Sequence, residues 1–249
     1  MAKGVSIKFS SYEETIHALL SLIKLDEELK KHPKIILKPN LKNSQSPGTN
    51  PEFVEQVLKF CLEYKNPATD IFIAEGSDGE DTMDLFESRG YKKLAEKYSV
   101  GLIDLNNAET ESLDNLGFLK FDKIQYPSIL LESFVISLPN LSQDSETGVM
   151  ASLSNMLGAF PARHYSGFLS KSKSKIRKWP IEYSIHDIIQ CKAPDFAIID
   201  ASEYGSILAG VPLEMDKQST KLLEESPDSV PYLRVMEDSM ITPQIDGLQ

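Results

Sequence analysis

The chain has 249 residues, of which 41% are hydrophobic and 25% are charged, a balance that is ordinary for one globular domain with a large core. Its formal net charge of −11 argues against a duplex nucleic-acid partner, because such binding depends on clustered Lys and Arg side chains. No apolar run approaches the roughly 18 residues of a membrane span, so we expect no membrane association.

The predicted elements begin with a short strand over residues 5–9 and an amphipathic helix that a capping-box pattern opens at Ser11. Compact apolar strands follow at residues 34–37, 71–74, 100–103, 129–138 and 196–199. Helices are predicted from Asn50, after the turn at residues 75–79 with a break at Gly90, over residues 149–157 and 181–190, and after Pro212 and Pro227.

Strands that alternate with helices predict an α/β fold, with a largely parallel or mixed sheet, helices on both faces and a single domain over residues 1–249. The apolar strands do not alternate with polar residues, which is typical of strands buried on both sides. Residues 106–128 have no clean periodicity, so an antiparallel insertion fits there. The pattern does not predict the order of the strands.

Polar side chains gather where the predicted strands end, namely Lys38, Asn40, Glu75, Asp78, Asp104, Asn140 and Asp200. In open α/β sheets, ligands bind outside the carboxyl ends of the strands, so this set predicts a cleft at one edge of the sheet. The alternative is that Asp, Asn and Gly residues only terminate strands and cap helices.

Lys38 is the most specific member of this set, because a lysine directly after a buried strand needs an anion, a carboxylate or a carbonyl beside its ammonium. Glu75 could be that partner for structural reasons. In the functional interpretation, Lys38 binds a ligand carboxylate or phosphate. Glu75, Asp104 and Asp200 then supply metal ligands or acid and base groups.

A second candidate segment covers residues 148–164, where small residues would let a helix N-terminus approach an anion. Asn155 lies on this predicted helix, and Arg163 and His164 follow it. Arginine offers a bidentate grip on an anion and histidine can move protons near neutral pH, although His164 also fits a loop residue without a role. The basic segment 171–178 fits either a mobile, solvated loop or a clamp for an anion or a partner.

The two cysteines, Cys61 and Cys191, lie too far apart in sequence for a disulfide framework or a zinc motif. Two thiolates are also too few for an iron–sulfur cluster held by this chain alone. Residues 1–5 run into the first predicted strand without a signal-peptide pattern, so we expect a cytoplasmic protein.

Several short motifs occur in the order expected for one family. They are LKPNL at 37–41, NPEFV at 50–54, AEGS at 74–77, Gly148-Val149, LSNMLG at 153–158, PARH at 161–164, IID at 198–200 and PLEMDK at 212–217. With these motifs the chain resembles the domain of unknown function 362 family, a group of uncharacterised prokaryotic proteins. The resemblance implies an α/β domain that is often joined to ferredoxin-like clusters, and it implies no settled reaction.

The sequence departs from that family's usual pattern at three positions, where Ser142, Asp144 and Ser154 replace a lysine, a histidine and a second lysine. Our leading hypothesis is a protein that binds a small anionic ligand at the strand-end cleft, with or without a divalent metal. Lys38, Asn40, Asn140, Asn155, Arg163 and His164 would hold the ligand. The alternative is a non-catalytic accessory protein that partners a separate iron–sulfur, redox or maturation protein. Whether the chain is an enzyme does not follow from its sequence.

Overall fold

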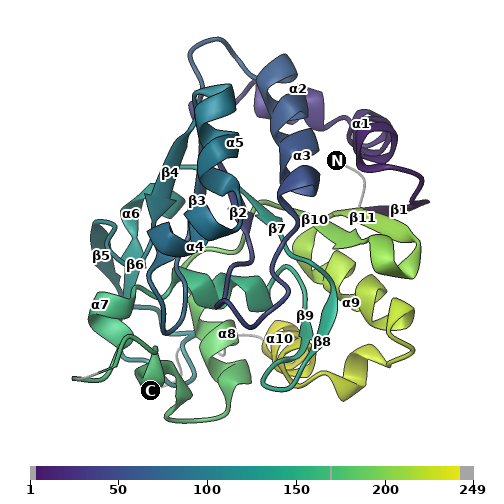
Figure 1. Cartoon of the computed structure of the whole chain (residues 1–249). Helices are drawn as coiled ribbons and strands as arrows, with labels where there is room; N and C mark the ends of the chain where they lie inside the picture. Colours follow the sequence, from purple (N-terminus) through teal and green to yellow (C-terminus); the bar gives the residue numbers. More distant parts are fainter. Residues whose placement is uncertain (1–3, 169, 242–249) are drawn as a thin grey trace.

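A mixed seven-stranded sheet forms the centre of the protein in the computed structural model, which describes residues 4–168 and 170–241 (Figure 1). The order of its strands is β1-β11-β10-β7-β2-β3-β4. These strands are β1 (Gly4–Lys8), β2 (Lys34–Pro39), β3 (Asp70–Glu75), β4 (Gly101–Asp104), β7 (Phe134–Leu138), β10 (Phe196–Ala201) and β11 (Ser206–Gly210). The run from β10 to β4 is parallel, whereas β1 and β11 pair antiparallel at one side. The predicted α/β class is confirmed.

The central strands are buried on both faces, as their unbroken apolar sequences predict. In β2, Ile35 and Leu37 belong to one hydrophobic core, while Ile36 belongs to the other. Successive side chains of a strand point to opposite faces, so a short run of aliphatic residues stabilises both layers at once. Lys38 has the same parity as Ile36 and therefore faces the second core.

The helices divide between these two layers along the chain. The first group packs on the core around Ile35 and consists of α1 (Tyr12–Leu22), α2 (Leu25–Leu29), α3 (Pro51–Tyr64), α4 (Thr82–Ser88) and α5 (Tyr91–Tyr98). The second group packs on the core around Ile36 and consists of α6 (Ser128–Leu131), α7 (Ala162–Tyr165), α8 (Ile181–Cys191), α9 (Pro212–Leu222) and α10 (Pro231–Ile241). In Figure 1 α1, α2, α3 and α5 lie in the upper half, and α8, α9 and α10 lie in the lower half. Short 3₁₀ helices occur at η1 (Ser154–Ala159), η2 (Ser174–Arg177), η3 (Ser202–Tyr204) and η4 (Pro227–Ser229).

Two helix starts follow the sequence closely. The Ser11 side chain accepts a hydrogen bond from the backbone N–H of Glu14, and the Asn50 side chain accepts one from the backbone N–H of Glu52. Both acceptors satisfy N–H groups that a helix leaves free in its first turn.

Three regions need comment against the sequence prediction. Residues 106–128 contain the antiparallel pair β5 (Thr110–Leu113) and β6 (Ile124–Pro127), so the expected insertion is present. The single strand predicted over 129–138 is wrong in its first half, which forms α6, and only β7 is extended. The Ser133 hydroxyl donates to the Ile129 carbonyl and closes that helical turn.

The helix predicted over residues 149–157 is also wrong. Residues 142–150 form the hairpin of β8 (Ser142–Asp144) and β9 (Gly148–Met150), and η1 follows it. Gly148 has φ +79°, a conformation that suits the turn of a hairpin and not a helix. Beyond the hairpin, the Asp216 carboxylate accepts the backbone N–H groups of Ser152 and Leu153, so the segment is organised by a tertiary contact.

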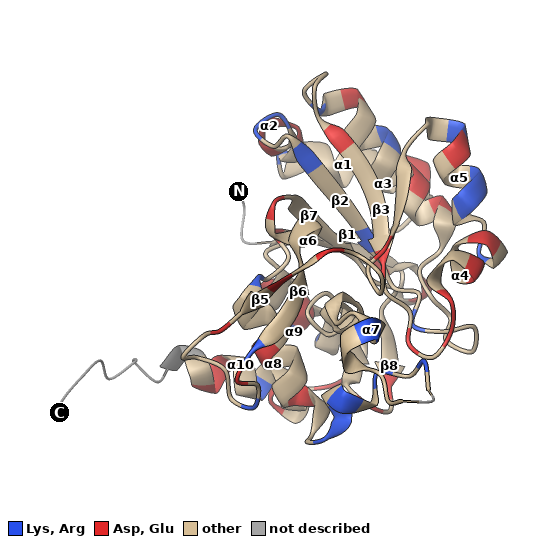
Figure 2. Cartoon of the chain, turned by 90° about the vertical axis from the view of Figure 1, so that its left-hand side faces the viewer, with Lys and Arg blue, Asp and Glu red and all other residues tan. Residues whose placement is uncertain are grey.

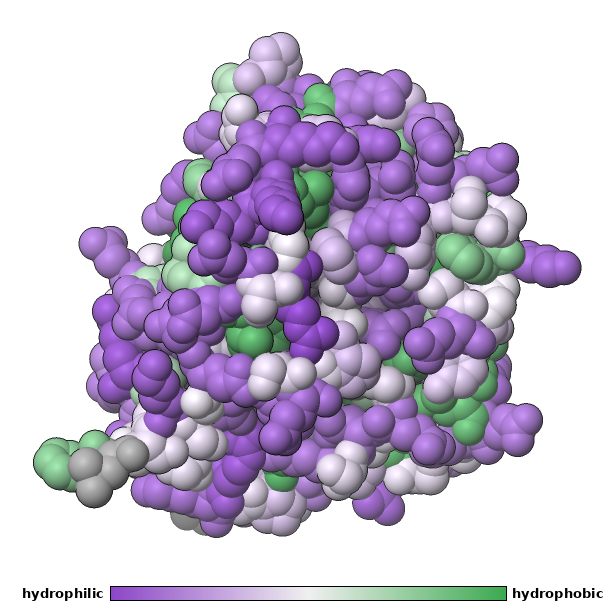
Figure 3. Space-filling model, in the orientation of Figure 1, coloured by the Kyte–Doolittle hydropathy of each residue, from purple (hydrophilic) through white to green (hydrophobic). Residues whose placement is uncertain are grey.

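No helix within the described ranges is both long and apolar enough to cross a bilayer. The face drawn in Figure 3 is predominantly hydrophilic, and its apolar residues form separate small patches.

Candidate functional site

The carboxyl ends of five parallel strands lie along one edge of the sheet. Along it, Lys38 is opposite Ser137, Glu75 is opposite Asp104, and Asn140 bridges to Asp200. The edge runs over four strand spacings from β10 to β4, or about 19 Å at about 4.8 Å each. One small ligand cannot contact all of these residues, so the predicted set divides among separate places.

A buried cluster forms where β2 and β3 end. The Lys38 ammonium lies 2.9 Å from Glu75 Oε2, 2.7 Å from the Asn155 carbonyl oxygen and 3.2 Å from Asn155 Oδ1. Lys38 is 0% exposed and Glu75 is 2% exposed. In Figure 2 a basic position at the end of β2 lies beside acidic positions at the end of β3. The structure thus brings together three of the residues that the sequence singled out.

Asn155 joins this cluster to the second half of the chain. Its Nδ2 donates to the Lys38 carbonyl at 3.0 Å and to the Ser137 hydroxyl at 3.0 Å. Glu75 Oε1 accepts the backbone N–H of Gly76 at 2.7 Å. Burial lowers the pKa of Lys38 below its ordinary value, and the Glu75 carboxylate opposes that shift. Every side chain of the cluster has partners, as buried polar groups require.

Gly158 lets η1 approach this cluster closely. A Cβ atom at this position would lie 2.0 Å from Glu75 Oε1 and 2.7 Å from Lys38 Nζ. Gly158→Ala should therefore push the buried ion pair apart and lower the free energy of unfolding by about 1–3 kcal/mol in urea denaturation. Gly117→Ala is the control, because its nearest neighbours are the movable side chains of Asn115 and Gln190. If Gly158→Ala loses no more free energy of unfolding than Gly117→Ala, then η1 can shift away from the ion pair without cost.

Lys173 is a functional candidate that the sequence prediction missed. It is 1% exposed, and its ammonium lies 2.7 Å from the Gly76 carbonyl oxygen and 3.2 Å from the Gly158 carbonyl oxygen. The interpretation of residues 171–178 as a mobile, solvated loop is therefore wrong at this position. Ile176 of the same segment is also buried, and it anchors η2 in the core. An aliphatic residue at position 176 was the available signal.

Ion pairs connect the loops that surround the buried cluster. Lys42 lies 3.2 Å from Asp144 Oδ2 and 3.0 Å from Glu146 Oε2. Arg177 pairs with Glu146 and lies 2.7 Å from Asp78 Oδ2. Although burial opposes it, the Lys173 backbone N–H and the Arg177 charge hold the pKa of Asp78 below its ordinary value. Glu146 therefore connects the β8–β9 turn to two separate basic residues.

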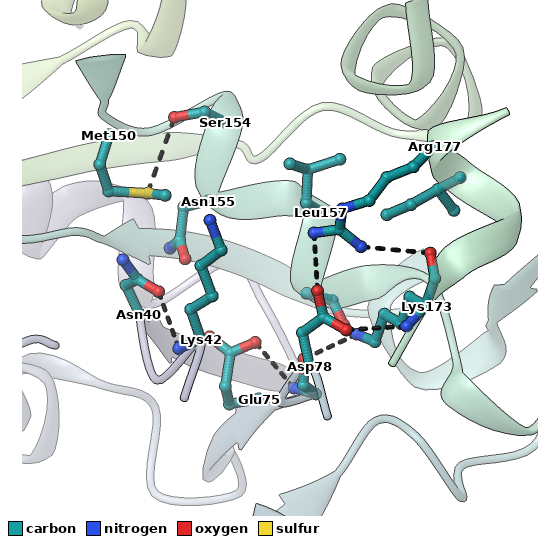
Figure 4. A pocket seen from close by; sticks show the side chains of 13 residues that line it. Asn40, Lys42, Glu75, Asp78, Met150, Ser154, Asn155, Leu157, Lys173 and Arg177 are labelled. Atoms are coloured by element: carbon teal, nitrogen blue, oxygen red, sulfur yellow. Dashed lines mark hydrogen bonds and ion pairs between the residues drawn. The ribbon is translucent and has the colours of Figure 1, made fainter. Parts of the chain in front are cut away.

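A small cavity lies between the sheet edge and the segment 150–177 (Figure 4). Its volume is about 30 Å³, which is room for about two water molecules. Five ionisable side chains line the cavity. Three are basic, namely Lys42, Lys173 and Arg177, and two are acidic, namely Glu75 and Asp78. Asn40 and Asn155 also line it.

Asp104, Arg163 and His164 lie elsewhere. Asp104 and Arg163 border a separate pocket beyond β4, where Arg163 donates to the Asn107 carbonyl and to His164. Burial and the positive charge of Arg163 lower the pKa of His164. These three residues do not reach the cavity that contains Lys173.

Asn140 and Asp200 border a third pocket on the other side of the edge. The Tyr12 hydroxyl donates to Asp200 Oδ2 at 2.8 Å, and burial together with the Asp200 charge raises the pKa of Tyr12 to about 12. Glu75, Asp104 and Asp200 thus end different strands, and the sequence-based metal set is not assembled. Within residues 4–168 and 170–241, no group of three His, Cys, Asp or Glu side chains could hold a metal ion.

The anion site expected at the start of the 149–157 helix is filled by the protein itself. Asp216, on α9, accepts from the backbone N–H groups of Ser152 at 2.7 Å and Leu153 at 2.9 Å, and from the Tyr232 hydroxyl at 3.0 Å. Burial raises the pKa of this carboxyl to about 6. The N–H groups do bind a carboxylate, but it belongs to a residue 64 positions away.

Comparison with known proteins agrees with this architecture. A similar solved structure is the lactate racemase apoprotein from Thermoanaerobacterium thermosaccharolyticum, with a TM-score of 0.55 and 13% identity. The match covers 88% of this chain and 56% of that one, so the chain spans just over half of that protein, and identity this low shows the fold alone. No curated protein matches.

The sequence places the chain in a family more directly. The model of the domain of unknown function 362 (DUF362) matches residues 35–206, which is more than half of the chain and includes Lys38, β3 and Lys173. The chain therefore belongs to the DUF362 family.

Proposed function

We propose that the protein binds a small anionic ligand, a carboxylate or a phosphate, in the cavity at the ends of β2 and β3. The observation that carries this proposal is the charge of the lining, where basic side chains outnumber acidic ones in a chain whose net charge is −11. The place is also the one that parallel α/β sheets use for ligands, outside the carboxyl ends of their strands.

Ligand entry requires a rearrangement, because a volume of about 30 Å³ is too small for a carboxylic acid or a phosphate. Two cations of the lining, Lys42 and Arg177, are joined by the carboxylate of Glu146, which contacts both. An anionic ligand would take the place of this carboxylate between the two cations. The β8–β9 turn would then move outward while Lys42 and Arg177 keep a negative partner.

A thermal-shift panel tests the proposal with inorganic phosphate, acetate, lactate, pyruvate and malonate. Lactate is included because the protein of similar fold is a lactate racemase by name. A ligand at 100 times its Kd should stabilise the fold by about 2.7 kcal/mol, and Arg177→Met should abolish that gain. Lys178→Met is the matched control, because Lys178 is an exposed cation one position further along. If none of the five anions raises the wild-type midpoint, the proposal is wrong.

Glu146→Gln gives a second expected result on the same site. Removing the competing carboxylate should tighten the binding of the best anion from the panel by about 1.5- to 5-fold, the range expected for a partly exposed ion pair. Isothermal titration would measure this change. The control is Glu96→Gln, which makes the same charge change at an exposed position of α5. Equal affinity in wild type and Glu146→Gln would show that this carboxylate does not compete with the ligand.

A divalent metal and a partner protein remain predictions from the sequence. Mg²⁺, Mn²⁺ and Zn²⁺ belong in the same panel, with and without the best anion, because an anionic ligand can itself supply ligands to a metal. The partner interpretation keeps some support from Lys171, Lys175 and Lys178, which are exposed on the surface of the basic segment.

A further inference from the structure

The two buried lysines beside the cavity have different sets of hydrogen-bond acceptors. Lys38 Nζ has three, which are a carboxylate oxygen of Glu75 and two oxygens of Asn155. Lys173 Nζ has two, the carbonyl oxygens of Gly76 and Gly158. Among the described residues, no carboxylate lies within 4 Å of Lys173 Nζ and no third acceptor lies within hydrogen-bond distance of it.

The number of acceptors distinguishes the protonation states of a buried lysine. An ammonium carries three N–H donors, and each needs a partner when water is excluded. A neutral amine carries two N–H donors and one lone pair. Lys38 therefore has the three protein acceptors that an ammonium needs. Lys173 has two carbonyl acceptors and no carboxylate, which suffices for a neutral amine, and the remaining position on its nitrogen is left to the cavity that Lys173 lines.

From this geometry we infer that Lys173 is a nucleophilic amine that condenses with the carbonyl group of a small oxo acid bound in the cavity. The inference rests on the proposed function, since it identifies the anionic ligand as one that also carries an aldehyde or ketone. Lys42 and Arg177 would hold its carboxylate. Both line the same cavity as Lys173.

The reaction needs no further reactant. The Lys173 nitrogen lone pair attacks the carbonyl carbon, and a proton passes from that nitrogen to the carbonyl oxygen to give a carbinolamine. Loss of one water molecule then leaves a C=N bond, which is an imine or, once protonated, an iminium ion. No electrons are gained or lost, so no oxidant or reductant takes part.

The surroundings keep the amine reactive near neutral pH. Burial, aided by the charge of the Lys38 ammonium, lowers the pKa of Lys173 to about 8 against the opposing charges of Glu75 and Asp78. At pH 8 the neutral fraction of Lys173 is therefore roughly a hundredfold larger than that of an exposed lysine with an ordinary pKa.

Reductive trapping with glyoxylate tests the inference. The whole chain is incubated at pH 8 with glyoxylate and sodium cyanoborohydride, which reduces the C=N bond to a secondary amine, and the modified lysines are then mapped by peptide mass spectrometry. We expect one carboxymethyl group on Lys173, formed about tenfold faster than on its neighbours. Lys171, Lys175 and Lys178 are exposed in the same segment and serve as internal controls. Lys173→Met should lose the fast phase, and Lys178→Met should keep it.

Stabilisation by an acid and trapping by glyoxylate test the two proposals separately. Lactate carries a carboxylate but no ketone, so it tests the anion site alone, whereas pyruvate carries both groups. If both acids stabilise the protein but glyoxylate modifies only the exposed lysines, Lys173 is not a nucleophile and the anion site stands. If Lys173 is trapped while no anion stabilises the fold, the amine is reactive and the anion site is wrong. If neither occurs, both proposals fail. The mapping is done on the wild-type chain, so its result stands even if Lys173→Met folds poorly.

Discussion

Glu75→Gln should lower the free energy of unfolding by about 3–5 kcal/mol, the usual consequence of removing one partner from a buried ion pair. Lys38 is 0% exposed, so its ammonium would remain in the interior with neutral amide and carbonyl oxygens as acceptors and no negative charge beside it. A side chain at 0% exposure cannot recover its hydration without a local rearrangement. Urea denaturation at pH 7 measures the loss, as a fall in the midpoint at an unchanged slope.

Two controls separate this loss from a general sensitivity of the sheet. Glu132→Gln breaks the pair with Lys34 at the other end of β2, where the side chains are 36% and 57% exposed, and should cost less than about 1 kcal/mol. The double variant Lys38→Met/Glu75→Gln removes both charges and should recover part of the loss. If the single and double variants are equally unstable, packing and not the unpaired charge explains the effect.

The layers of the fold could be predicted because each depends on short-range patterns. Apolar strands without alternation, capped helices and strand-end polar residues are all visible in one sequence, and the five parallel strands do meet at one edge. The pairing of Lys38 with Glu75 could also be anticipated, because a lysine after a buried strand requires a nearby negative partner.

The rest depended on contacts between distant segments. The Lys-Ser alternation around Lys173 is typical of a solvated loop, and only the packing of Ile176 on the core buries it. Asp216 resembles a surface residue of α9 until Ser152 and Leu153 approach it from far along the chain. Strand order keeps the three predicted metal ligands apart, since Asp104 and Asp200 end strands at opposite sides of the parallel run. Periodicity carries no information on that order.

The stability contributed by Lys173 should rise with pH, by about 3 kcal/mol between pH 7 and pH 10.5. In the folded protein its pKa is lowered to about 8, whereas in the unfolded chain it has the ordinary value of 10.5. Below pH 8 both states carry the proton, and folding bears the full cost of burying the ammonium. Between pH 8 and 10.5 the unfolded chain binds more protons than the native state, so stability increases as pH rises.

The measurable quantity is the difference in free energy of unfolding between wild type and Lys173→Met, followed by urea denaturation across that pH range. Other titrating groups contribute equally to both proteins, so most of their effect cancels in the difference. The same difference for Lys178→Met should stay flat, because Lys178 is exposed in the native state. A flat or falling difference for Lys173→Met would mean that the buried group keeps its proton, through a hydrogen-bond partner beyond Gly76 and Gly158. In that case trapping by glyoxylate should also fail, since a protonated nitrogen has no lone pair to attack a carbonyl carbon. The hydrogen-bond acceptors of Lys173 therefore bear on both the pH dependence of the free energy of unfolding and the reaction with glyoxylate. The outcome of one measurement limits the outcome expected of the other.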